Sequence, residues 1–202
     1  MRYGMKAIVA LLLAVSGSAY AGDEFVNVTA GFRVTKPSEW VYVTASENVE
    51  NMRAVKLKDE EFHAAMLKYS TAPLVAMMKY QEPFEDVNPS FKVQIKPYGA
   101  MKGKPPKEVL EFLLPQIGRV FKDFVIAQAP AEVLVSGIAS AYAKVEYTME
   151  IPDGRTFPTT SEMWIVPHGE YFFMIGAGTR QDEKTGTRAE IREILDSVKV
   201  EG

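Results

Sequence analysis

Residues 171–177 (Y-F-F-M-I-G-A) and residues 190–200 (E-I-R-E-I-L-D-S-V-K-V) decide the fold of this chain. The first segment is apolar on both of its faces, which predicts a central strand covered on both sides. Before the second, Thr187 and Glu190 have the spacing of a capping box, which predicts a helix start. The buried stripe of that helix is expected at Ile191, Ile194, Leu195 and Val198. Together they predict a sheet that lies between two layers.

Alternating segments predict further strands on either side of this centre. In residues 139–151 the odd positions are apolar and most even positions are polar, which predicts a long strand with one wet face. Turns at Pro152-Asp153-Gly154 and His168-Gly169 delimit the strand that returns from it. Shorter strands are expected at residues 25–28, 31–34, 40–43, 74–81 and 91–97.

Two more helices are expected. One lies within residues 59–69, where apolar side chains recur at helical spacing. The other follows Pro105-Pro106 and extends to Phe121, with Pro115 expected to kink or split it. Helices between antiparallel hairpins predict an α+β fold, a three-layer α/β/α sandwich whose central antiparallel sheet is flanked by helices.

Three segments resemble the PsbP and DcrB-like proteins of the Mog/PsbP superfamily. G-F-R-V-T-K-P-S-E-W at residues 31–40 is similar to the opening strand of PsbP with its Pro and Trp, and N-P-S-F-K-V-Q-I-K-P at residues 88–97 to a later strand. The third is Y-F-F-M-I-G-A-G-T-R with the helix after it. The resemblance implies an α/β/α sandwich with an antiparallel sheet. It also implies an accessory, binding or chaperone role, although one fold hosts several roles.

Residues 1–21 have the pattern of a cleaved secretory signal. Arg2 and Lys6 precede a nine-residue apolar run at 7–15, and Ala19 and Ala21 supply the small residues of a cleavage site. The apolar run is too short to span a membrane, which takes roughly 20 residues. The sequence therefore predicts a signal peptide at 1–21, cleavage near Ala21, a single domain at 22–202, and a bacterial periplasmic location. The short signal also differs from the long transit peptide of thylakoid PsbP, which argues against a photosynthetic role.

Composition excludes several classes of function. Without the signal, the chain has 21 cationic and 26 acidic side chains, a net charge of −5. Because nucleic-acid binding requires clustered cations, we expect no nucleic-acid partner. The chain has no cysteine, which excludes disulfides, thiolate metal sites and cysteine nucleophiles. No second apolar run is long enough to span a membrane. A soluble exported domain is expected.

No residue pattern predicts catalysis. The only histidines are His63 and His168, and a zinc site built from them with Glu60 would require residues far apart to converge. The carboxylates at 59–61 and 82–86 are expected to be solvated charges at a helix start and in a loop. The chain has no nucleophile elbow, zincin or P-loop motif. We therefore predict no catalytic residue, no cofactor and no metal ligand.

The loop at residues 98–107 is the best candidate for a contact surface. Two glycines leave it mobile, and Pro105 and Pro106 set the direction in which the chain leaves it. Three lysines beside a Tyr and an exposed Met suit an acidic partner, although a simple solvated loop has the same composition. The predicted partner-contact residues are Tyr98, Met101, Lys102, Lys104 and Lys107.

Three functions are compatible with the sequence. The first is a non-enzymatic periplasmic accessory protein that binds another protein of the cell envelope. The second is a carrier of a small hydrophobic ligand or peptide, held in a groove lined by methionines such as Met77 and Met78. The third is an enzyme with a site that no motif marks.

Overall fold

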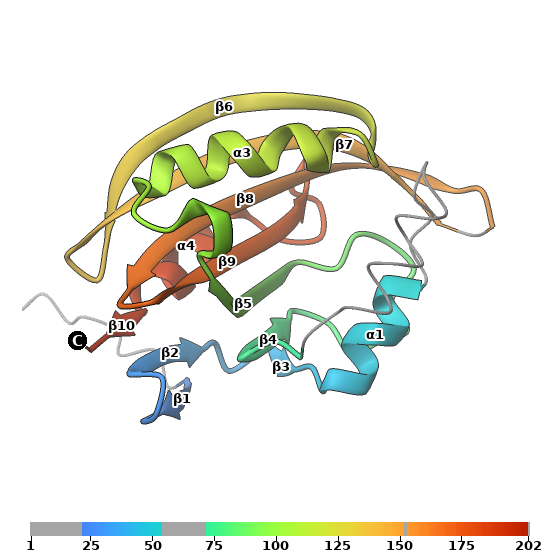
Figure 1. The fold of residues 1–202 in the computed structure, drawn as a ribbon. Coiled ribbons are helices and arrows are strands. Elements are labelled where there is room, and N and C mark those ends of the chain that lie inside the picture. The colour runs from blue at the N-terminus through green and yellow to red at the C-terminus, as the bar shows by residue number, and fades with distance from the viewer. Residues whose placement is uncertain (1–21, 54–71, 152, 202) are drawn as a thin grey trace, which may run out of the picture.

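The computed structural model describes residues 22–53, 72–151 and 153–201 (Figure 1). The expected signal at 1–21, the expected helix at 59–69 and His63 lie outside these ranges. The described elements are β1 Asp23–Asn27, β2 Phe32–Lys36, β3 Val41–Tyr42, α1 Ala45–Arg53, β4 Val75–Met78, β5 Ser90–Pro97, the 3-10 turn η1 Gly99–Met101, α3 Pro106–Gly118, β6 Lys122–Val135, β7 Ile138–Glu150, β8 Thr156–His168, β9 Tyr171–Arg180, α4 Arg188–Asp196 and β10 Lys199–Val200.

The strands form two antiparallel sheets. The larger has the order β3-β4-β5-β9-β8-β7-β6, and the smaller has the order β1-β2-β10. β9 is the middle strand of the larger sheet, which confirms the central strand predicted at 171–177. The separate three-stranded sheet was not predicted, because its strands are short and β10 follows α4 at the far end of the chain.

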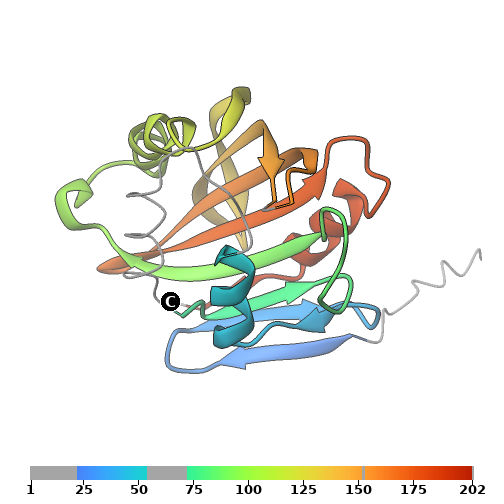
Figure 2. The same ribbon diagram turned by 90° about the vertical axis from the view of Figure 1, so that its right-hand side faces the viewer.

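Each face of the larger sheet carries its own apolar cluster. On β9, Phe173 and Ile175 belong to the cluster that α4 completes, whereas Phe172 and Met174 belong to the cluster that α3 completes. Residues that alternate along a strand point to opposite faces, so α3 and α4 cover opposite sides. Figure 2 shows the sheet between them. The fold is therefore α+β, with a mostly antiparallel sheet.

The start of α4 follows from its sequence. The Thr187 hydroxyl accepts the backbone N–H of Glu190 at 3.3 Å, and the Glu190 carboxylate accepts the backbone N–H of Thr187 at 2.7 Å, a complete capping box. The stripe after it is buried, as predicted: Ile191, Ile194, Leu195 and Val198. The apolar stripe thus packs α4 against β5 of the larger sheet and β2 of the smaller sheet.

The segment with the PsbP-like opening has a buried lysine at its end. Phe32 and Val34 of β2 point into the α4-side cluster. Lys36 is also buried, and its ammonium donates to the Trp40 carbonyl at 2.8 Å and lies 3.3 Å from an Asp23 carboxylate oxygen. Pro37 ends the strand because it has no N–H for the ladder. This tight turn places Trp40 in the core.

Three predictions from sequence need correction. β6 was missed, because Pro130 and the irregular register around it disrupt the alternation that marks a strand. The wet face predicted for the even positions of β7 is wrong for the first half of the strand, where Ser140 and Tyr142 are buried. Pro115 does not split α3, which continues to Gly118.

One helix, α1, has a local signal that was overlooked. The Thr44 hydroxyl accepts the backbone N–H of Glu47 at 3.2 Å, and the Glu47 carboxylate accepts the backbone N–H of Thr44 at 2.7 Å. The spacing Thr-x-x-Glu at 44–47 is therefore a second capping box in the chain.

Candidate functional site

The loop at residues 98–107 joins β5 to α3 and is held by its own backbone. The Met101 N–H donates to the Tyr98 carbonyl at 2.9 Å, and the Lys104 N–H donates to the Met101 carbonyl at 3.0 Å. Gly99 and Gly103 have φ angles of 53° and 80°, which glycine adopts without the strain of a side chain. These contacts give the loop a defined conformation.

Two of the predicted contact residues pack inward. The Tyr98 ring lies against Phe172 of β9, with 5.1 Å between the ring centroids, and burial raises the pKa of its phenol. Met101 is half-buried and packs against the α3-side cluster, so the prediction of an exposed methionine is wrong. Both residues anchor the loop to the sheet.

The three lysines of the loop are exposed, and each lies beside a carboxylate. Lys102 is 2.5 Å from Glu170, which lies in the turn between β8 and β9. The other two pairs lie at the start of α3 with i,i+4 spacing: Lys104–Glu108 at 3.0 Å and Lys107–Glu111 at 3.9 Å. The loop therefore presents balanced ion pairs and not a purely cationic patch. The Glu170 contact joins residues 68 positions apart, which no local pattern indicates.

A hollow of about 430 Å³ lies between this loop and the turn after β8. Its walls include Pro105 and Pro106 at the start of α3 and Pro167 near the end of β8, together with Tyr98. The Lys102–Glu170 pair joins the two walls, and the side chains are 70% and 79% exposed. Prolines offer C–H surface and no N–H donors. The hollow therefore suits an apolar side chain of a partner, with polar contacts at its rim.

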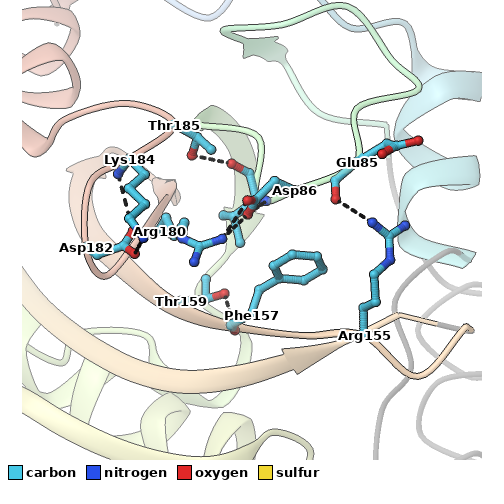
Figure 3. A network of polar contacts seen from close by, with 10 residues as sticks. Glu85, Asp86, Arg155, Phe157, Thr159, Arg180, Asp182, Lys184 and Thr185 are labelled. Atoms are coloured by element: carbon cyan, nitrogen blue, oxygen red, sulfur yellow. Dashed lines mark hydrogen bonds and ion pairs between the residues drawn. The ribbon is translucent and has the colours of Figure 1, made fainter.

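A second polar cluster lies at the other end of β9 (Figure 3). Nη1 of Arg180 donates to both oxygens of the Asp86 carboxylate, at 2.7 and 2.5 Å, while Nε donates to Asp182 at 2.8 Å. Arg155, in the turn just before β8, donates to the Glu85 carbonyl at 3.0 Å. The Phe157 ring lies 5.9 Å from each guanidinium. These contacts hold the loop between β4 and β5 against the sheet.

Part of the acidic run at 82–86 has a structural role in the network around Arg180. The Asp86 carboxylate binds Arg180, and the Thr185 hydroxyl donates to the Val87 carbonyl at 2.6 Å. The earlier interpretation of this run as solvated charge is thus wrong for Asp86, whose partner lies 94 positions away. A carboxylate occupied by a guanidinium is poorly placed for acid–base chemistry.

A buried Tyr–Glu pair lies under α4. The Tyr142 hydroxyl donates to the Glu162 carboxylate at 2.5 Å, and both side chains are buried. Burial and this hydrogen bond raise the pKa of the Tyr142 phenol well above its usual range. Among the described residues, the Thr160 hydroxyl is buried without a hydrogen-bond partner. The pair was not predicted from the sequence, because its two residues lie on neighbouring strands, 20 positions apart.

His168 belongs to an aromatic group and to no metal cluster in the described part of the chain. Its ring lies 5.0 Å from Tyr171 and 5.5 Å from Phe173, between centroids. Within residues 22–53, 72–151 and 153–201, no three His, Asp or Glu side chains are grouped to hold a metal ion. No helix of these ranges is long and apolar enough to cross a membrane.

Comparison with solved structures identifies the fold. The chain matches cyanobacterial PsbP from Synechocystis sp. PCC 6803 with a TM-score of 0.51 and 12% identity, covering 94% of this chain and 99% of that one. The Saccharomyces cerevisiae Ran-binding protein Mog1p matches with a TM-score of 0.50 and 13% identity, covering 90% and 96%. This chain has the Mog/PsbP-like fold. The resemblance seen in the sequence is thereby confirmed at the level of fold.

Two further solved structures, from other bacteria, also match the chain. LpqN, involved in cell envelope biogenesis of Mycobacterium tuberculosis, matches with a TM-score of 0.50 and 12% identity, covering 92% of this chain and 88% of LpqN. A Bacteroides thetaiotaomicron structure matches with a TM-score of 0.46, and the chain spans 49% of its length. No protein-family model matches the sequence. No curated protein matches it either.

Proposed function

We propose that this protein is an exported, non-enzymatic accessory protein of the cell envelope that binds another protein. The observation that carries the proposal is the hollow between the loop at 98–107 and the turn after β8. A salt bridge between two exposed side chains, Lys102 and Glu170, connects the loop to the turn. Exposed ion pairs contribute little stability, about 0–1 kcal/mol. The Lys102–Glu170 pair can therefore open at low cost and exchange its partners for those of a bound protein.

The shared fold supports the class of function. Mog1p is a Ran-binding protein, and LpqN takes part in envelope biogenesis. In the proposed three-layer sandwich, α3 would be one outer layer, and α4 with the small sheet the other. Both faces of the sheet are filled by packed side chains in the described residues. This packing favours protein binding over the carriage of a hydrophobic ligand between helix and sheet.

The test uses a tagged copy of the full chain, expressed in the organism from which the chain comes. N-terminal sequencing of the periplasmic protein should begin near Gly22, and a chain that keeps residues 1–21 would contradict export. Affinity capture should recover a specific partner. The paired exchange Lys102→Glu with Glu170→Lys keeps the internal ion pair but reverses the charges presented to that partner. Recovery should fall for this variant while thermal stability is unchanged.

A matched control is Lys184→Glu, an exposed lysine in the loop between β9 and α4. It should recover the partner as the unmodified chain does. Equal recovery by the exchanged variant would show that the partner binds elsewhere and would refute the proposed surface. A small apolar molecule found by native mass spectrometry, with no protein partner, would instead favour the carrier hypothesis.

A further inference from the structure

A groove of about 410 Å³ lies on the α4 side of the larger sheet, at the tip of the β6–β7 hairpin. Residues 133–137 of the hairpin form one wall, and the C-terminal half of α4 with Lys199 forms the other. The buried Trp164 ring of β8 lies between them. This groove is separate from the hollow at residues 98–107, because that hollow lies on the α3 side of the same sheet.

The strand beside the groove is an open sheet edge. β6 is the last strand of its sheet, and its register with β7 is regular from Ala131 to Val135. Leu134 is 74% exposed. Towards the start of β6, Pro130 and the register shifts before Ala131 interrupt the edge, and such features protect edges from added strands. The pairing-competent part of β6 is therefore its C-terminal end.

The turn determines which backbone groups of this edge are free. Ser136 and Gly137 have φ angles of 53° and 76° and form a two-residue connection between Val135 and Ile138. In such a hairpin the two flanking residues bond to each other, and the pattern then alternates along the strand. The backbone N–H and C=O groups of Leu134 and of Glu132 therefore point away from β7.

Charged side chains line the groove next to this edge. Arg192 and Lys199 form no ion pair with any residue in the described ranges, and neither does Asp196. The Ser136 hydroxyl accepts the Val200 N–H at 3.0 Å, which leaves its own O–H free to donate. Two cations and a hydroxyl can bind a carboxylate, and Asp196 opposes that binding.

We propose that the end of β6 binds an extended acidic segment of a partner protein as an added antiparallel strand. The backbone of the segment pairs with Glu132 and Leu134, and one acidic side chain enters the groove between Arg192 and Lys199. Main-chain pairing supplies affinity in this mode of recognition, and the side-chain pocket supplies selectivity. The site goes beyond the loop surface and is tested independently of it.

The test is a selection of random heptapeptides displayed on phage, with the folded full chain as the target. Counter-selection uses Leu134→Pro, which removes an outward N–H and no β6–β7 hydrogen bond. Enriched peptides should be rich in β-branched residues and carry Asp or Glu. NMR titration with one enriched peptide should shift the amide signals of Glu132 and Leu134 and slow the exchange of those two protons.

Charge variants that leave the sheet edge intact make the proposal falsifiable if Leu134→Pro fails to fold. Arg192→Ala with Lys199→Ala should weaken binding of the enriched peptide about tenfold, and Asp196→Asn should tighten it about threefold, as expected for charges a few ångströms apart near a surface. Enrichment of peptides without acidic residues, or no enrichment, would overturn the proposal. Self-association of the chain that shifts the same two amides without peptide would overturn it in favour of a second copy.

Discussion

Truncation of Ile194 tests whether α4 seals the sheet. The side chain is 1% exposed and lies in the cluster that joins α4 to β2, β5 and β9. Ile194→Ala removes three carbon atoms. At about 0.8 kcal/mol per buried methylene, the lost transfer free energy is about 2.4 kcal/mol. The residual cavity adds to this loss, and measured Ile→Ala changes in cores cost about 2–5 kcal/mol.

We therefore expect Ile194→Ala to lower the free energy of unfolding by about 3 kcal/mol. For a domain of this size that corresponds to a fall in Tm of about 6–12 °C. Urea titrations followed by circular dichroism would measure the loss, provided that the slope against urea is unchanged.

The control is Glu193→Ala, an exposed position on the same helix, which should stay within about 0.5 kcal/mol of the unmodified chain. A loss below about 1 kcal/mol for Ile194→Ala would refute the reasoning, because a side chain sealed in the core cannot be removed so cheaply. Equal losses for the two variants would mean that the helix itself, and not its packing, had been perturbed.

Three further predictions concern single contacts. Thr187→Ala should cost about 1 kcal/mol in urea titration through loss of the capping box, whereas Thr187→Ser should be nearly neutral. Arg180→Met should cost about 1–2 kcal/mol because the carboxylate of Asp86 loses its charged partner, and an unchanged midpoint would show that the pair contributes nothing. Burial and the hydrogen bond to Glu162 raise the pKa of Tyr142, so the native phenol stays protonated where the unfolded chain ionises. Stability should therefore fall as the pH rises above about 10, less steeply in Tyr142→Phe, as followed by tyrosinate absorbance and unfolding.

Among the elements with local signals, the central strand and the last helix were predicted from the sequence, whereas α1 was overlooked. The apolar segment at 171–177 is the middle strand because it is covered on both faces, and the pattern after Thr187 is a helix with the predicted buried stripe. β6 was missed because it is an edge strand with an internal proline, and such a strand buries little and shows no clean alternation. The site residues were only partly understood, because Met101 packs inward and Lys102 has a partner in a distant turn.

The sequence by itself determined the capping boxes, the turns with glycine, the apolar stripes and the absence of cysteine chemistry. These depend on residues within a few positions of one another. Only the tertiary structure decided which polar groups meet: Asp86 with Arg180, Tyr142 with Glu162, and Ser136 of the β6–β7 turn with Val200 of β10. Such contacts depend on the register and order of strands distant in sequence. That order is set by how all the apolar faces pack at once, which no local pattern encodes.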